Sequence, residues 1–192
     1  MILKNLAEET RPIHEKVERE NVASKIMDHT ISLYQYGKLL VDNYIAYSTL
    51  EAYVLAHKAK LPHVLLPFVG EDKSTALMHD LNNLHETLPE TYPFNPVDNS
   101  WPALAGMIYV MEGSMLGGML MAKNIKQCPS LANLGEQYFF TGDTASKATR
   151  WKQFKEVMGS IGFDEAQTRS AITGAKEAFA YFETVYARGS SR

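Results

Sequence analysis

The stretch from Trp101 to Lys126, WPALAGMIYVMEGSMLGGMLMAKNIK, is the part of the sequence around which the rest of the chain is organised. Between Trp101 and Ala122 the only formally charged residue is Glu112, so we expect this segment to be buried. Its length favours a helix over a strand. The sequence therefore predicts one long buried helix in the middle of the fold.

Three glycines, Gly113, Gly117 and Gly118, fall within six positions at the centre of this predicted helix. Each interior glycine costs a helix roughly 1 kcal/mol relative to alanine, so three together invite a kink. Gly113 and Gly117 are one turn apart, as are Ser114 and Gly118, so the four small residues share one face. A face without large side chains allows another group to approach the backbone closely.

Three explanations of this bare face are open. Small residues four positions apart are typical of close packing between two helices. A membrane span is a second explanation, because the nearly uncharged run approaches the roughly 20 residues needed to cross a bilayer. Glu112 in the middle of the run, Pro102 and the glycines all weigh against it. The third explanation is a planar ligand that lies on the bare face.

The composition is that of an ordinary globular chain, with 192 residues, 45% hydrophobic and 21% charged. We expect a single domain over residues 1–188 and a disordered tail over 189–192. The formal net charge of −3 gives no reason to expect binding to nucleic acid or to an anionic membrane surface. One cysteine, Cys128, and the lack of an apolar signal segment at the N-terminus predict a cytoplasmic location.

The first twenty residues are predicted to form an amphipathic helix with a histidine on its apolar face. That face comprises Leu3, Leu6, Thr10, Ile13, His14 and Val17. Pro12 either kinks this helix or marks its true start, capped by Thr10. A lone histidine on an apolar face is more often a core residue than a metal ligand, so His14 alone does not establish a metal site.

Further helices are predicted over Ser32–Lys58, Asp72–Thr87, Ser146–Gly159 and from Asp164 onward, with Ser32 and Asp164 as N-caps. Prolines between positions 89 and 96 predict a loop, and residues 128–143 are expected to be irregular. There is no internal repeat and no strand-like alternation. The fold class is therefore predicted to be all-α, as a single-domain multi-helix bundle.

Common metal and nucleophile motifs do not fit this sequence. None of the residues three positions before the six histidines is acidic, which argues against a Glu-x-x-His di-iron site. The pairs His57/His63 and His79/His85 are six apart and lie on different helix faces, which argues against zinc. A thiol nucleophile at Cys128 is a weak alternative, because no base lies near it in the sequence.

The features that remain are His14, the bare glycine face and a basic run. The run contains Lys147, Arg150, Lys152 and Lys155. Together they suit haem, because an imidazole can ligate the iron, a glycine backbone can cover the opposite porphyrin face, and cations can pair with the propionates. The alternative for the basic run is a solvated helix face.

These residues resemble motifs of the haem oxygenase family. Thr10-Arg-Pro-Ile-His14-Glu-Lys-Val-Glu18 is similar to the proximal-helix motif, and Tyr109-Val-Met-Glu-Gly113-Ser114-Met-Leu-Gly117-Gly118 to the distal glycine motif. Further similar segments, in the same order and spacing, are Tyr138–Phe140, Ala148–Phe154 and Ala175–Phe179. The resemblance covers nearly the whole chain.

The resemblance implies a bundle that holds haem between the first helix and the kinked glycine-rich helix. His14 would be the proximal iron ligand, and the glycine helix would form the flexible distal wall. Lys152 would anchor a propionate. The residues assigned to the site in this way are Thr10, His14, Val17, Gly113, Ser114, Gly117, Gly118, Arg150 and Lys152.

The sequence departs from the family pattern at two positions. In animal-type members an aspartate follows the first glycine and organises distal water, and Ser114 stands there instead; bacterial members also lack that aspartate and are active. A basic residue commonly follows the first propionate anchor by one turn, and Glu156 stands there, which leaves Arg150 or Lys155 as substitutes.

The activity implied by the resemblance is the O₂- and electron-dependent cleavage of haem b to biliverdin, CO and free iron. Haem is then both cofactor and substrate, and a reductase or ferredoxin supplies the electrons. Neither nucleic acid nor membrane insertion is expected. One alternative is a non-catalytic haem-binding or haem-sensing protein on the same scaffold, and another is a related helical scaffold with a different small-molecule activity, such as thiamin degradation.

Overall fold

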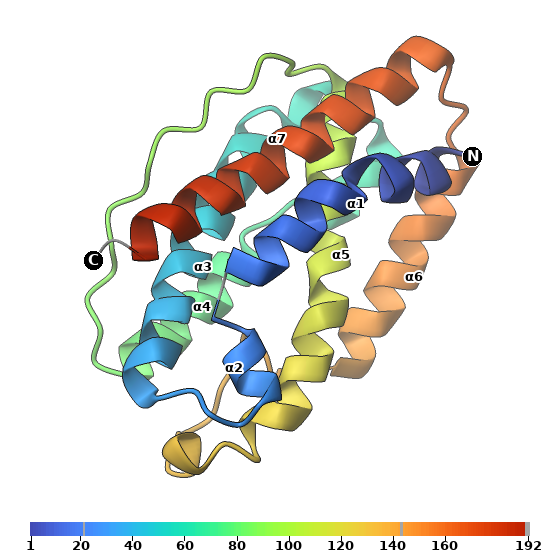
Figure 1. The fold of residues 1–192 in the computed structure, drawn as a ribbon. Helices are drawn as coiled ribbons and strands as arrows, with labels where there is room; N and C mark the ends of the chain where they lie inside the picture. The colour runs from blue at the N-terminus through green and yellow to red at the C-terminus, as the bar shows by residue number, and fades with distance from the viewer. Residues whose placement is uncertain (21, 143, 191–192) are drawn as a thin grey trace.

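The computed structural model describes residues 1–20, 22–142 and 144–190, and these residues form helices and connecting loops without a strand (Figure 1). The α-helices are α1 (Ile2–Glu20), α2 (Ser24–Met27), α3 (Leu33–Ala56), α4 (Asp72–Asn83), α5 (Trp101–Ile125), α6 (Thr144–Ser160) and α7 (Glu165–Ser190). Three short 3₁₀ helices are η1 (Lys58–Lys60), η2 (His63–Phe68) and η3 (Pro129–Leu131). The predicted all-α class is confirmed. Of the expected tail, residues 189 and 190 belong to α7, and residues 191–192 lie outside the described residues.

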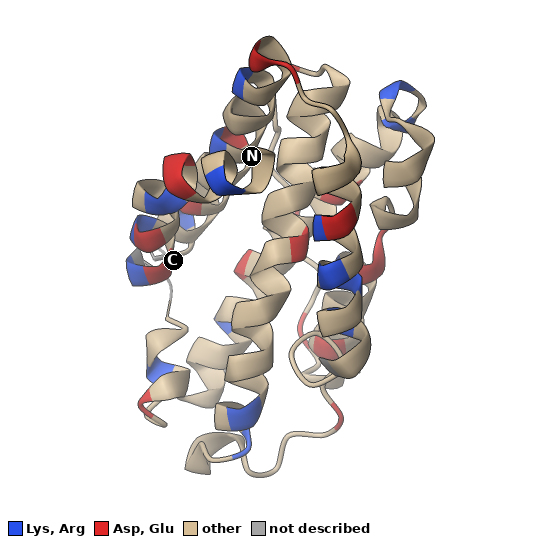
Figure 2. Ribbon diagram, turned by 90° about the vertical axis from the view of Figure 1, so that its right-hand side faces the viewer, with Lys and Arg blue, Asp and Glu red and all other residues tan. Residues whose placement is uncertain are grey.

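Helix α5 is the central helix, and it packs against α7, α6, α2 and α3. The glycines do not interrupt it, because it is one helix from Trp101 to Ile125. Figure 2 shows that it carries few charges, whereas charged residues are frequent on the outer helices. By length and composition α5 is apolar enough to cross a membrane, but 56% of its most apolar stretch is buried inside the protein. Its packing is that of a core helix, and no membrane is indicated.

The axes of α5 and α7 come unusually close where two glycines face the opposite backbone. A Cβ atom added to Gly106 of α5 would collide with the carbonyl oxygen of Ala171 in α7. A Cβ added to Gly174 of α7 would collide with the carbonyl oxygen of Ala103 in α5. Close packing between helices therefore does occur in this fold, but at Gly106 and Gly174 rather than at the glycines of the predicted bare face.

Helix α1 lies along α7, beside the central helix (Figure 1). Leu6 of α1 is fully buried. Glu9 of α1 accepts a hydrogen bond at Oε2 from Lys176 Nζ of α7 at 2.8 Å. The helix continues through Pro12. Thr10 is not an N-cap, because its hydroxyl donates to the carbonyl oxygen of Leu6 at 2.7 Å within the helix. Of the two possibilities left open by the sequence, a start at Thr10 is therefore wrong.

Both predicted N-caps are confirmed. Ser32 Oγ accepts from the backbone N–H of Gln35 at 3.2 Å, and the Gln35 side chain accepts from the Ser32 backbone N–H at 3.1 Å. Asp164 and Gln167 form the same reciprocal pair at the start of α7. Helix α4 ends at Asn83, earlier than predicted, because the chain turns at His85, which has a φ of 57°.

We predict that Gly106→Ala lowers the free energy of unfolding by about 1–3 kcal/mol, because the added methyl forces α5 away from α7. Urea denaturation measures the effect. The matched control is Gly159→Ala in α6, where an added Cβ meets nothing within 4 Å. That variant should be unchanged or stabilised by less than about 1 kcal/mol. Equal stability of Gly106→Ala and the parent protein would contradict the close crossing.

Candidate functional site

A cavity of about 460 Å³ lies between α1 and α5. Its size is within the range of about 300–1,000 Å³ typical of small-molecule and cofactor sites. The α1 wall includes Thr10, His14 and Val17, and the α5 wall includes the segment from Gly113 to Gly118. The first helix and the glycine helix therefore face each other across one cavity, as the sequence predicted.

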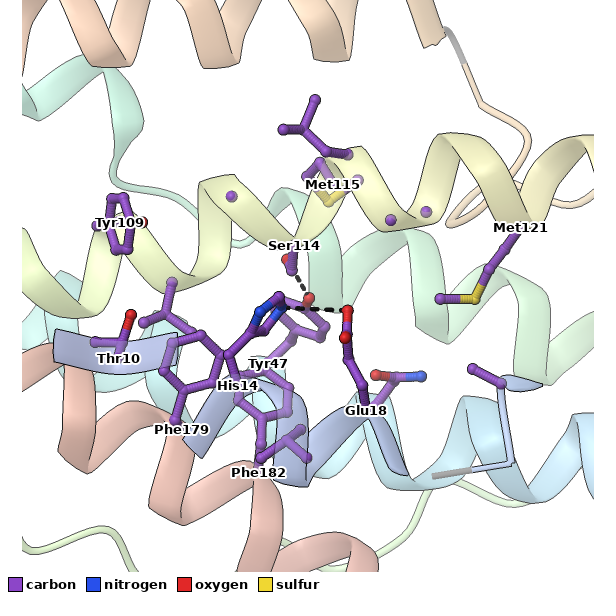
Figure 3. Close-up of a pocket in the computed structure, with 18 of the residues that line it drawn as sticks. Thr10, His14, Glu18, Tyr47, Tyr109, Ser114, Met115, Met121, Phe179 and Phe182 are labelled. Carbon is purple, nitrogen blue, oxygen red and sulfur yellow. Dashed lines mark hydrogen bonds and ion pairs between the residues drawn. The ribbon is translucent and has the colours of Figure 1, made fainter. Parts of the chain in front are cut away.

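On the α1 wall, the imidazole of His14 projects toward α5 (Figure 3). Its side chain is 49% exposed, so it is accessible from the cavity rather than sealed in the core. Nε2 of His14 lies 3.4 Å from Oε1 of Glu18, one turn further along α1. The ring also contacts Phe179 of α7, with the two ring centroids 5.3 Å apart. A carboxylate and an aromatic ring thus orient the imidazole toward the cavity.

On the α5 wall, the bare face opens into the cavity. A Cβ added at Gly117 would meet nothing within 4 Å, and one at Gly118 would come no closer than 3.8 Å, to the Phe140 ring. At Gly113 the nearest neighbour would be the indole of Trp151 at 3.4 Å. These three glycines therefore do not serve close helix–helix packing. All three line the cavity, and at Gly117 the backbone is exposed to it.

Ser114 lies on the same wall, and its hydroxyl is engaged on both sides. The hydroxyl of Tyr47 in α3 donates to Ser114 Oγ at 2.5 Å, and Ser114 Oγ donates to the carbonyl oxygen of Met111 at 2.7 Å (Figure 3). Burial raises the pKa of Tyr47, and the charges of Glu51 and Glu112 raise it further, although the hydrogen bond with Ser114 opposes this. Tyr47 therefore stays protonated, and the pair is a neutral hydrogen-bonded unit.

The rest of the cavity is mainly aromatic. Phe179 and Phe182 come from α7, and Phe139 and Phe140 come from the segment before α6. The backbone N–H of Phe139 donates to Oδ2 of the buried Asp80 at 2.9 Å, which ties this segment to α4. Rings of this kind give an apolar lining suited to a large flat ligand.

Among the described residues, no group of three or more His, Cys, Asp or Glu side chains is arranged to hold a metal ion. Cys128 is buried, with its sulfur 3.3 Å from the carbonyl oxygen of Asn124. Burial raises the pKa of its thiol, so it lacks the thiolate character of a nucleophile. The candidate functional site is the cavity between α1 and α5.

Residues 1–188 match the profile of the family described as heme oxygenase. The chain belongs to the haem oxygenase family. A heme oxygenase of Xanthomonas campestris pv. campestris (strain 8004) is 35% identical over 113 residues, which is 58% of this chain and 66% of that protein. Heme oxygenase PigA of Pseudomonas aeruginosa is 28% identical over 111 residues, 57% of this chain and 56% of that protein. The aligned part thus spans less than two thirds of each relative.

The fold matches that of a solved haem oxygenase. The structure of the NO- and CO-bound enzyme from Neisseria meningitidis superimposes with a TM-score of 0.74 at 21% sequence identity. The match covers 98% of this chain and 92% of that chain. The predicted haem oxygenase-like bundle is therefore confirmed.

Two residues predicted to bind haem in this haem oxygenase family member do not line the cavity. Arg150 instead donates from Nε to Oε2 of Glu112 at 2.8 Å and lies near Asp72. The side chain of Lys152 is 76% exposed and lies 3.9 Å from Oε1 of Glu156. Arg150 thus faces the buried carboxylate of Glu112, and Lys152 faces Glu156 on its own helix. The sequence pattern showed the basic run and Glu156, but not the pairing of Arg150 with Glu112.

Among the polar residues of the cavity that sequence reasoning missed are Arg11 and Tyr47. Arg11 of α1 is the one lysine or arginine among the described residues that line it, and its position three residues before His14 was a usable signal. Tyr47 was interpreted as a packing residue with a polar tip, and no local pattern connects it to Ser114, 67 positions away. Only the packing of α3 against α5 brings the two hydroxyls together.

We predict that Gly117→Ala raises the stability of the ligand-free protein by up to about 1 kcal/mol, because alanine favours the helix and its methyl enters open space. Urea denaturation measures the change. Gly113→Ala is the comparison, since its methyl would press against Trp151 and should gain less. A loss of stability at Gly117 would contradict an open face there.

Proposed function

We propose that this chain is a haem oxygenase that cleaves haem b to biliverdin, CO and free iron, using O₂ and electrons from a separate reductase or ferredoxin. The observation that carries the proposal is the cavity whose opposite walls are a histidine side chain and a helix face bare of side chains. The residues fit haem, because the imidazole can ligate iron and the glycine backbone can lie against the porphyrin. We further propose a cytoplasmic location, which a single unpaired cysteine fits.

On the proximal side, His14 is proposed as the axial iron ligand. An imidazole that presents one ring nitrogen to iron can donate its other N–H to a neighbouring acceptor, and this second bond fixes the ring orientation. Glu18 is within reach of the ring, one turn along the same helix. Thr10 and Val17 line the same wall and would contact the porphyrin.

On the distal side, we propose that the α5 wall lies against bound haem without placing an acidic side chain next to it. The Ser114 hydroxyl donates a hydrogen bond to the carbonyl oxygen of Met111, and the Tyr47 hydroxyl donates one to Ser114 Oγ. Neither hydroxyl is therefore free to donate strongly to a ligand on iron. Bound haem would supply the oxygen chemistry, and a distal wall without an acid from these two residues would favour transfer of oxygen to the porphyrin.

For the propionates we propose Arg11 as an anchor at the cavity wall. Arg11 and Glu18 lie on either side of His14 along α1, so the negative propionates are drawn toward Arg11 and away from Glu18. Lys152 remains a proposed second anchor, since its long exposed side chain is held only by a weak surface pair with Glu156. Arg150 is not part of the proposal, because it is committed to Glu112.

We predict that His14→Ala abolishes the spectrum of histidine-ligated haem and lowers biliverdin formation by a factor of about 100 or more, because the iron loses its protein ligand. Absorption spectra with hemin, and a turnover assay with a reductant and O₂, measure both effects. Added imidazole should restore part of the spectrum. His63→Ala is the control, because His63 is exposed and does not line the cavity.

Two outcomes of that experiment would contradict the proposed function. An unchanged spectrum and rate in His14→Ala would exclude His14 as the ligand. A parent protein that binds hemin through a histidine but releases neither bilin nor CO would be a non-catalytic haem carrier.

We predict that Arg11→Gln weakens hemin binding by about 10-fold, because a charged hydrogen bond of about 1.5 kcal/mol to a propionate is lost. Fluorescence quenching during hemin titration measures the affinity. Arg19→Gln is the matched control, being exposed on the same helix and outside the cavity lining. Equal weakening in both variants would indicate a general charge effect and not an anchor.

A further inference from the structure

Glu112 is a buried carboxylate whose role the proposed function leaves unexplained. It immediately precedes Gly113 in α5, yet it does not line the haem cavity. Its side chain is 2% exposed. Oε1 accepts from Lys73 Nζ at 2.8 Å, and Oε2 accepts from Arg150 Nε at 2.8 Å. One carboxylate therefore binds two cations from different parts of the chain.

These two ion pairs join three helices behind the glycine segment. Lys73 is in the first turn of α4 and is itself buried, with 8% of its side chain exposed. Arg150 is in α6, and it also donates to the carbonyl oxygen of Pro67 at 3.2 Å and lies over the ring of Phe68. At position 112 the central helix is thus tied to α4, α6 and η2.

The location of this tie matters because, among the described residues, the cavity side of α5 has no ion pair and is held by the neutral hydrogen bond between Tyr47 and Ser114. Gly113, Gly117 and Gly118 offer no side chains by which neighbouring elements could hold the helix in place. No charged residue follows Glu112 in α5 until Lys123. The ion-paired carboxylate is therefore the last charged attachment of α5 before the bare segment that faces the cavity.

The same contacts also locate part of the cavity wall. Trp151 follows Arg150 in α6, and its indole is the nearest neighbour of the Cβ position at Gly113. The Trp151 ring also packs against Tyr109, with centroids 5.7 Å apart. A shift of α6 relative to α5 would move this aromatic wall relative to the glycine face.

Buried ion pairs are weak evidence for stability, since apolar residues of similar volume often serve as well, and their best-attested use is to fix one register. We propose that Glu112, through Lys73 and Arg150, is a positioning residue that sets the distance between the glycine face of α5 and bound haem. This inference rests on the proposed function only in taking haem as the occupant of the cavity.

The test compares Glu112→Gln with the parent protein. Each is loaded with hemin, reduced and bound to CO. The C–O stretching band reports the surroundings of the ligand beneath the glycine face, and we expect it to shift or broaden. We expect turnover to fall by about 10-fold or more, because a small misplacement of a site has effects of this size. Hemin affinity should change much less, since no contact with haem is lost.

Asp98→Asn is the matched control. Asp98 accepts from the backbone N–H of Ser100 at 2.8 Å and from the Ser170 hydroxyl, so it also attaches α5 to α7, but at the N-terminal end of α5. This variant should keep the parent CO band and turnover, even where its melting temperature is as low as that of Glu112→Gln. The same spectral change in Asp98→Asn would overturn the proposal.

Arg150→Lys provides a second variant should Glu112→Gln fail to fold, because it keeps the charge and loses the geometry of the Nε contact. Hydrogen exchange of the ligand-free protein should then quicken selectively over residues 113–122. Unchanged exchange and an unchanged CO band would overturn the proposal. A parent protein without biliverdin formation would refute the proposed function alone, since the band and the exchange comparison need no turnover.

Discussion

The close crossing of α5 and α7 sets the geometry on which the site depends. Gly106 and Gly174 bring the two backbones together, so the central helix has one position on α7. Helix α1 also packs along α7 and makes far fewer contacts with α5. Helix α7 therefore supports both walls of the cavity, and the space between α1 and α5 is fixed by where each of them lies on it. The rings of Phe179 and Phe182, which belong to α7, line that space.

Glycines in α5 serve two opposite purposes, and the local sequence does not separate them. At Gly106 the missing side chain allows another backbone to come close, whereas at Gly117 it leaves open space. Apolar periodicity and capping residues were sufficient to predict the main helices and the N-caps at Ser32 and Asp164. The crossing at Gly174 could not be predicted, because it depends on which helices meet and not on the pattern of either one.

The candidate site was predictable where it consists of one helix face and not where it depends on pairing between helices. His14 and the glycine face follow from helical periodicity, and both line the cavity. Arg150 was expected at the haem site, but it does not line the cavity, because the buried carboxylate of Glu112 binds it. For the same reason the contact between Tyr47 and Ser114 was missed. A sequence pattern assigns a residue to a face, and only the neighbouring helix decides what that face meets.

The support of both walls by α7 has a consequence for how the protein is made. Helix α1 carries His14 and is synthesised first, whereas α7 is the last helix of the described chain. A nascent chain on the ribosome therefore contains the histidine and the glycine helix before it has the element that holds them apart. The complete cavity needs residues 165–190 to have emerged and docked, because Phe179, Phe182 and Tyr186 of α7 are part of its lining.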